Sequence, residues 1–166
     1  MRYLLAISLL LGTFSCSNSA ERGRMIDSKK LNHLIFQKDK TAVYIWTTWC
    51  SGCRKTLAET LPGLQEAIDT SQVQILLIAA SKNKAEVDSL VSDAALKGNS
   101  YLLNFTGPDK GMFQNLGIQF LLERSFPNDE IFTRAIPVFF LVGRNGKVLN
   151  KKLPHSYNEA IGLLNK

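Results

Sequence analysis

The feature that most constrains the fold is an apolar segment, residues 41–47, that runs almost directly into a pair of cysteines. The segment reads TAVYIWT, which is rich in β-branched and aromatic residues and has no polar alternation. Such a run is typical of a strand that is buried on both faces of a sheet. Cys50 and Cys53 follow it and open a stretch in which apolar residues recur at helical spacings, namely Leu57, Leu61, Leu64 and Ile68. A buried strand followed at once by an amphipathic helix is typical of an α/β protein.

The same alternation of helix and strand patterns continues through the chain. Apolar residues at helical spacing predict further helices over residues 28–37, 84–97, 110–122 and 156–165. Apolar and β-branched runs predict further strands over residues 73–80, 101–105, 137–142 and 148–153. This order predicts a mixed sheet with helices on both faces, in one domain over residues 28–166. Residues 106–135 have the least regular pattern and are interpreted as an insertion in that domain.

Three local signals indicate where elements begin, bend and turn. Ser28 is expected to cap the first helix. Pro62-Gly63 is expected to kink the helix that follows the cysteines, because proline lacks the amide hydrogen that a helix interior uses. Asn145-Gly146 predicts a tight hairpin turn between the last two strands.

The first residues have the pattern of a secretory signal peptide. Arg2 supplies a positive start, residues 3–14 are mostly apolar, and residues 15–20 are small and mostly polar. As a helix, the apolar run would reach about 18 Å, which is short of the roughly 30 Å hydrocarbon core of a membrane. We therefore expect export of the chain rather than a transmembrane anchor.

Two cleavage positions fit this signal. The run Thr13-Phe14-Ser15-Cys16 resembles a bacterial lipoprotein signal, in which residues 1–15 are removed and Cys16 becomes the lipidated first residue. Cleavage after Ala20 is the alternative, and Cys16 would then leave with the signal peptide. The lipoprotein interpretation predicts a tether over residues 16–27 and a chain that is anchored by lipid to a bacterial membrane and faces the periplasm.

The charge of the chain does not indicate a nucleic-acid partner. The 166 residues carry 20 Lys and Arg against 14 Asp and Glu, which is a formal net charge of +6. These charges are scattered, and the sequence has no basic stripe with interleaved aromatic residues. The length and the 45% apolar composition predict one globular domain.

The Cys50-Ser51-Gly52-Cys53 run has the spacing of a redox-active dithiol. Two cysteines three residues apart at the start of a helix can close a disulfide with little backbone change. At that position the free amides and the dipole of the helix favour a thiolate on Cys50, and Arg54 and Lys55 add positive charge. Such a thiolate attacks a substrate disulfide, and Cys53 then attacks the mixed disulfide and releases the product.

Residues 46–55 resemble the active-site segment of the thioredoxin superfamily. They read WTTWCSGCRK and are most similar to the exported, often membrane-tethered TlpA-like thioredoxins, in which a W-x-x-W-C-x-x-C-[RK] run is common. Residues 135–140, AIPVFF, resemble the loop and strand that carry the cis-proline of that family. Residues 144–147, RNGK, resemble the hairpin that follows it. The resemblance covers roughly residues 28–166.

This resemblance implies a three-layer thioredoxin-like sandwich and a protein-disulfide oxidoreductase. Cys50 would be the attacking cysteine and Cys53 the resolving one, with no cofactor beyond their redox-active disulfide. Pro137 would be the cis-proline, the backbone of Ile136 would pair with substrate as an added strand, and Trp49 would shield the dithiol. The partners implied are exported protein thiols and disulfides, together with a membrane electron donor.

The sequence departs from the family pattern at several positions. The dipeptide between the cysteines is Ser-Gly, which lacks the histidine of strong oxidants and favours a reductant. Tyr44 and Thr56 stand where some members carry carboxylates, and Glu59 is expected to be an exposed helix residue. Pro62 comes twelve residues after Cys50 instead of about eight, as if one helical turn, residues 56–59, were inserted.

Other uses of the two cysteines have less support. A Cys50–Cys53 disulfide closes too short a loop to be a strong structural staple. A zinc site needs two more ligands, and His33 and His155 lack ligand-like spacing, so no metal is expected. The sequence around Cys50 also lacks the Pro-x-x-x-Thr-x-x-Cys run of peroxidases.

The remaining alternative is a thioredoxin-fold binding module. In that case the CxxC would be incidental, and residues 106–135 would recognise a partner. The phenylalanines of this segment could line a groove, but most are expected to pack in the core; they are Phe113, Phe120, Phe126 and Phe132.

Overall fold

The computed structural model describes residues 24–98, 100–107, 111–129, 131, 135–151 and 157–164. The signal segment, Cys16, Phe132 and His155 lie outside these residues, so the predictions for them stay predictions. Among the helices that are described, none has the length and apolar character needed to cross a membrane.

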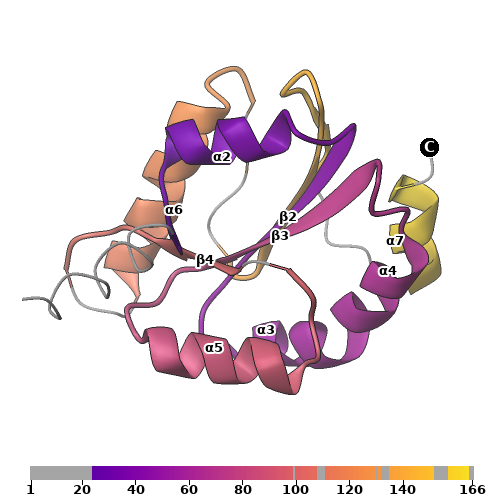
Figure 1. Ribbon diagram of the computed structural model, residues 1–166. Helices are drawn as coiled ribbons and strands as arrows, with labels where there is room; N and C mark the ends of the chain where they lie inside the picture. Colours follow the sequence, from indigo (N-terminus) through magenta and orange to yellow (C-terminus); the bar gives the residue numbers. More distant parts are fainter. Residues whose placement is uncertain are drawn as a thin grey trace, which may run out of the picture.

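A six-stranded mixed sheet forms the centre of the domain (Figure 1). Its strands are β1 (Met25–Ile26), β2 (Lys40–Trp46), β3 (Val73–Ala79), β4 (Ser100–Leu103), β5 (Val138–Gly143) and β6 (Val148–Asn150). The spatial order is β1-β4-β3-β2-β5-β6. Strands β1, β4, β3 and β2 are parallel, whereas β5 is antiparallel to both β2 and β6. The predicted mixed sheet is confirmed.

Helices cover both faces of this sheet. They are α2 (Ser28–Ile35), α3 (Ser51–Lys55), the π-helix η1 (Thr56–Thr60), α4 (Leu61–Ala67), α5 (Lys84–Asp93), α6 (Met112–Ser125) and α7 (Tyr157–Leu164). Helices α2 and α6 pack on one face, and the other helices pack on the opposite face (Figure 1). The three-layer, thioredoxin-like sandwich is therefore confirmed.

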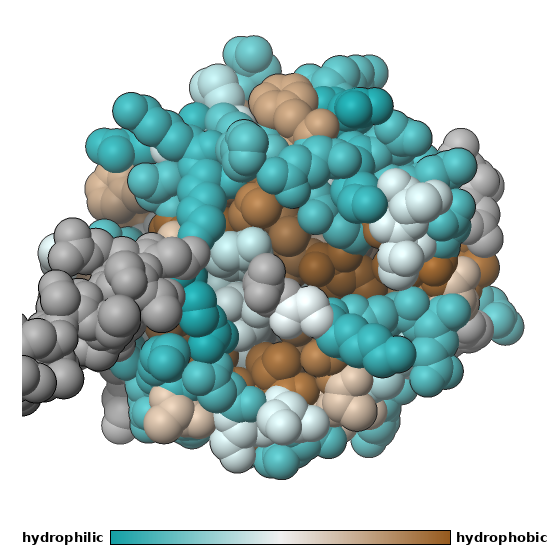
Figure 2. Space-filling view, viewed as in Figure 1, coloured by the Kyte–Doolittle hydropathy of each residue, from teal (hydrophilic) through white to brown (hydrophobic). Residues whose placement is uncertain are grey.

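Strand β2 is buried on both faces, which explains why its sequence shows no polar alternation. Val43 and Ile45 point into the core beneath α2 and α6, whereas Ala42, Tyr44 and Trp46 point into the core on the other face. All five side chains are fully buried. Figure 2 shows the corresponding layering from outside, with hydrophobic residues in the middle of the visible face between hydrophilic surfaces.

The folded domain begins earlier than the sequence pattern indicates. Residues 24–27 were expected to belong to the tether, but Met25 and Ile26 form strand β1 beside β4. Arg24 fixes this segment, because its guanidinium lies 2.5 Å from Asp88 and donates to the carbonyl of Ser100 at 3.1 Å. A strand of only two residues leaves almost no periodic signal in a sequence.

Asp27, and not Ser28, caps helix α2. Its side chain accepts a hydrogen bond from the backbone amide of Lys30 at 2.8 Å, whereas Ser28 is already inside the helix. Both residue types are favourable caps, so the sequence alone placed the helix start one residue late.

The irregularity expected at Pro62-Gly63 lies one turn earlier. Residues 56–60 form η1, in which the amide of Leu61 donates to the carbonyl of Thr56 rather than to that of Leu57. Pro62 then lies in the first turn of α4, where its missing amide hydrogen costs little. A π-helical turn takes up extra residues within a helix, and its position coincides with the inserted turn inferred at residues 56–59.

Candidate active site

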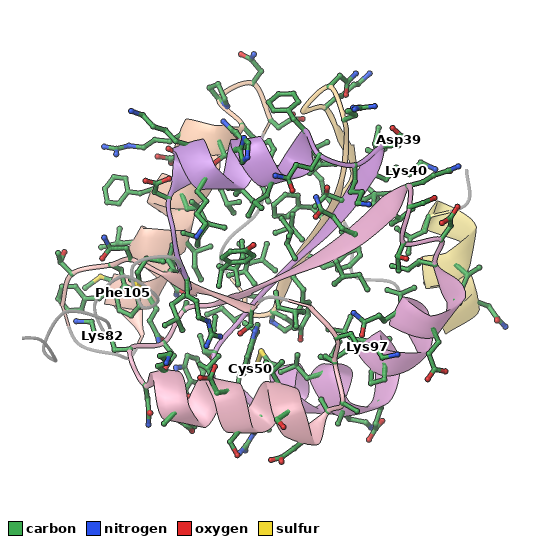
Figure 3. The ribbon with its side chains drawn as sticks, in the orientation of Figure 1. Asp39, Lys40, Cys50, Lys82, Lys97 and Phe105 are labelled. Atoms are coloured by element: carbon green, nitrogen blue, oxygen red, sulfur yellow. A yellow bond between two sulfur atoms is a disulfide. The ribbon has the colours of Figure 1, made fainter. Side chains whose placement is uncertain are left out.

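Cys50 lies between the end of β2 and the start of α3 (Figure 3), and Cys53 lies inside α3. Cys50 is the N-cap of α3, and its sulfur accepts a hydrogen bond from the amide of Cys53 at 3.1 Å. A disulfide joins the two residues, whose Cα atoms are 5.2 Å apart. Because the amide of Cys53 points at the Cys50 sulfur, this environment would stabilise a thiolate when the bond is reduced.

The two sulfur-bearing residues differ in access to solvent. Cys53 is fully buried in the core beneath α3, whereas Cys50 is half-buried at its edge. An incoming disulfide can therefore approach Cys50 and not Cys53. This asymmetry supports the predicted roles of an attacking Cys50 and a resolving Cys53.

The loop before β5 closes the site from the other side. The Ile136–Pro137 peptide bond is cis, as the family resemblance implies. The carbonyl oxygen of Ile136 lies 3.8 Å from the Cys50 sulfur, although the two residues are 86 positions apart in the sequence. Strands β2 and β5 pair directly, with Ile45 opposite Val138, and this pairing brings the loop to the dithiol. Strand pairing by Ile136 with a substrate stays a prediction.

Trp49 is exposed at the site and is held by a residue that the sequence analysis missed. Its side chain is 52% exposed, and its indole N–H donates to the Oε1 atom of Gln114 at 2.9 Å. Gln114 lies on α6 and is fully buried. The available signal was a lone amide on the inward stripe of the helix, which otherwise consists of Ile118, Leu121 and Leu122. Nothing in the local sequence connects this stripe with the dithiol.

Arg54 and Lys55 lie on the exposed last turn of α3. The ammonium of Lys55 is 3.9 Å from the carboxylate of Glu59, and both side chains are largely in solvent. Such a pair contributes little to stability. Glu59 is exposed, as expected, and support of the thiolate by the two basic residues stays a prediction.

The aromatic residues of α6 and its C-terminal end divide between core and surface. Phe126 is buried, as expected, and stacks edge-to-face on Phe140 with ring centroids 5.3 Å apart. Phe113 and Phe120 are 42% and 58% exposed, so the expectation of core packing is wrong for them. Met112 and Leu116 are exposed on the same helix, which is why its sequence shows no clear polar face.

Tyr44 is one of the positions at which the sequence departs from the pattern of the family that it resembles. Its hydroxyl donates to the carbonyl oxygen of Cys53 at 3.2 Å, and its side chain is fully buried. Burial raises the pKa of Tyr44 to about 12, and a hydrogen bond with Thr56 lowers it in part. The hydroxyl therefore stays protonated at the pH of thiol exchange, and it holds the Cys53 backbone without transferring a proton.

A Tyr44→Phe variant should change how stability depends on pH. The pKa of Tyr44 is raised from 10.0 to about 12 in the folded protein. The contribution of the protonated Tyr44 hydroxyl to the unfolding free energy is therefore complete below pH 10. It is lost as the pH rises to about 12, because the unfolded chain releases this proton first. Over this range we expect the wild type to lose roughly 2–3 kcal/mol more unfolding free energy than the variant. Urea unfolding at several alkaline pH values measures this difference, and parallel profiles would contradict it.

Comparison with known proteins identifies the same fold. The family model described as Redoxin matches residues 24–161. The thioredoxin domain of a thiol-disulfide oxidoreductase from Bacteroides vulgatus is 20% identical, with a TM-score of 0.56 over 78% of this chain and 82% of that one. A thioredoxin family thiol:disulfide interchange protein from Chlorobium tepidum is 13% identical, with a TM-score of 0.58 over 81% and 82%. A secreted Mycobacterium tuberculosis disulfide oxidoreductase homologous to E. coli DsbE is 17% identical, with a TM-score of 0.52 over 78% and 83%. A search of curated proteins found no match.

Proposed function

This chain belongs to the Redoxin family, and from that premise we propose that it is an extracytoplasmic thiol–disulfide oxidoreductase that reduces or reshuffles disulfides of exported proteins. The observation that carries the proposal is the Cys50–Cys53 disulfide at the start of α3. One sulfur-bearing residue is accessible and the other is buried directly behind it. That arrangement suits an exchange reaction better than a structural cross-link, because so short a loop contributes little stability.

The reaction would proceed in two exchanges. The reduced Cys50 thiolate attacks one sulfur of a substrate disulfide, a mixed disulfide forms, and the other substrate sulfur leaves as a thiolate that takes up a proton. The Cys53 thiol loses its proton and attacks the Cys50 sulfur, which releases the second substrate sulfur. Two electrons have then passed to the substrate, and the Cys50–Cys53 disulfide remains. A reductant must restore the dithiol, and we propose that it is a membrane electron donor.

The substrate would lie across the rim of the site. The Ile136 backbone would pair with an extended peptide that carries the target cysteine, and its carbonyl oxygen 3.8 Å from the Cys50 sulfur supports this proposal. Trp49, which directly precedes Cys50 in the chain, offers an exposed aromatic surface. Backbone pairing is largely independent of sequence, which suits an enzyme with several protein substrates.

The proposed location rests on the first twenty residues. A signal segment over residues 1–15 and lipidation of Cys16 would hold the domain at a bacterial membrane, facing the periplasm. The residues between Cys16 and strand β1 would then form the tether, since the folded domain begins by Arg24. A structural relative described as secreted supports an exported role.

The reduction potential of the Cys50–Cys53 pair tests the proposed direction of electron flow. We expect a value near that of thioredoxin, about −270 mV, because the Ser-Gly dipeptide lacks the histidine of strong oxidants. A Cys16→Ser protein would be equilibrated with dithiothreitol redox buffers and alkylated, and the oxidised fraction would be read by mass spectrometry. A potential near about −120 mV would indicate an oxidant instead. A pair that does not exchange with the buffer would contradict the enzymatic activity itself.

A further inference from the structure

Gln114 joins two segments of the active-site region through one buried amide. Its Nε2 atom donates to the carbonyl oxygen of Ala80, just after β3, at 2.6 Å. Its Oε1 atom accepts from the indole N–H of Trp49 at 2.9 Å. The amide of Ala80 in turn donates to the carbonyl of Trp46 at 2.8 Å, so the chain around the amide is itself held to the end of β2.

The chemistry of the two partners allows only one orientation of this amide. An indole N–H can only donate, and a backbone carbonyl can only accept. A glutamine side chain satisfies both at once, whereas a glutamate would lack the donor for Ala80 and a methionine would lack both groups. Gln114 is fully buried, so losing either hydrogen bond would leave a polar group without compensation from water.

The side chain that this amide holds belongs to the residue before the reacting cysteine. Trp49 directly precedes Cys50, and about half of its side chain is exposed to solvent. A half-exposed indole can rotate about its side-chain bonds unless something fixes it, and the hydrogen bond to Gln114 fixes its buried end. Helix α6 thereby sets the position of the aromatic side chain that directly precedes Cys50.

We propose that Gln114 is a positioning residue that holds the Trp49 ring at the rim of the Cys50–Cys53 disulfide and so controls the approach of thiols and substrates to Cys50. The inference deepens the proposed function and rests on it for the effect on substrates. The effect of Gln114 on the Cys50–Cys53 disulfide concerns only the access of a small thiol. The rate of reduction by a small thiol and the turnover of a protein substrate can therefore be measured separately.

The test measures the rate at which dithiothreitol reduces the Cys50–Cys53 disulfide. In Gln114→Met, which keeps side-chain length and removes the hydrogen bonds to Trp49 and Ala80, we expect the second-order rate constant to rise about 3- to 10-fold, the equivalent of one lost hydrogen bond. Gln119→Met is the matched control, because Gln119 lies exposed on the same helix and bonds to Glu123. We expect its rate constant to equal that of the wild type.

Trp49→Phe removes the hydrogen bond between Trp49 and Gln114 by changing its exposed partner. This variant leaves the buried Gln114 in place, so its result does not depend on whether a core substitution folds. It keeps an aromatic ring but replaces the indole with a smaller phenyl ring that has no N–H group, so we expect a rise in rate that is at least as large. Adding Gln114→Met to Trp49→Phe should cause no further rise if Gln114 acts through the indole. An unchanged rate in Trp49→Phe, or an equal effect of Gln114→Met in both backgrounds, would overturn the proposal.

An insulin-reduction assay measures the effect of Gln114 on a protein substrate. We expect Gln114→Met to raise KM by a similar factor of about 3 to 10 while kcat changes less, because the ring meets the substrate before the chemical exchange. If wild-type protein does not reduce insulin, the proposed function loses support for general substrates. The dithiothreitol rates still decide the role of Gln114 in that case.

Discussion

A Cys50→Ser variant is expected to lose insulin reduction almost completely, by at least about 10³-fold, when assayed with dithiothreitol as the electron source. A serine hydroxyl does not ionise near neutral pH and cannot form a disulfide with the substrate. The half-buried Cys50 is the accessible member of the pair, and Cys53 behind it is fully buried. Among the residues that the structure describes, no second thiol lies at the rim of the site to replace it.

Cys53→Ser is the matched variant, because it makes the same atomic change one helical turn away. Cys50 can still attack, but nothing resolves the mixed disulfide, so covalent complexes with substrates should accumulate and dissolve on reduction. Captured from cells, the bound partners should be exported proteins if the proposed location is right. Partners that are mainly cytoplasmic would contradict that location.

The pair of variants also distinguishes enzyme from binding module. Background turnover that is equal in wild type and Cys50→Ser would show that the CxxC is incidental and would favour partner recognition by residues 106–135. Covalent capture that is equal for Cys50→Ser and Cys53→Ser would show that the trapping does not report the proposed reaction.

Phe140→Ala is expected to have the largest effect on stability, a loss of about 3–5 kcal/mol of unfolding free energy. Phe140 lies in the middle of β5, opposite Val43 of β2, and is fully buried. Its ring packs on Phe126 at an interplanar angle of 79°. Truncation to alanine removes this contact and leaves a cavity between the sheet and the end of α6. Denaturant unfolding at neutral pH measures the loss.

Phe120→Ala is the control for Phe140→Ala, since it removes the same atoms from a side chain that is 58% exposed on α6. We expect its unfolding free energy to stay within about 0.5 kcal/mol of the wild type. A small loss in Phe140→Ala would mean that the core collapses around the missing ring. A large loss in Phe120→Ala would show that the exposed ring makes a stabilising contact.

Local sequence patterns predicted most of the fold. The apolar run over residues 41–47 predicted β2, because a strand between two helical layers needs no polar side. The cysteines at its end, together with Pro137 before another apolar run, resembled one superfamily closely enough to predict the three-layer sandwich. These signals lie within short windows of the sequence, where helix and strand periods can be read directly.

Contacts between distant segments decided the rest of the site. Sequence alone could not pair Gln114 with Trp49, 65 residues away, or place the Tyr44 hydroxyl on the Cys53 carbonyl. It also gave no sign that Arg24 ties a two-residue strand to the sheet edge. Periodicity reports which face of an element is buried, and the dithiol motif reports the chemistry. Which buried polar group meets which partner depends on how the layers pack, and only the tertiary structure specifies that packing.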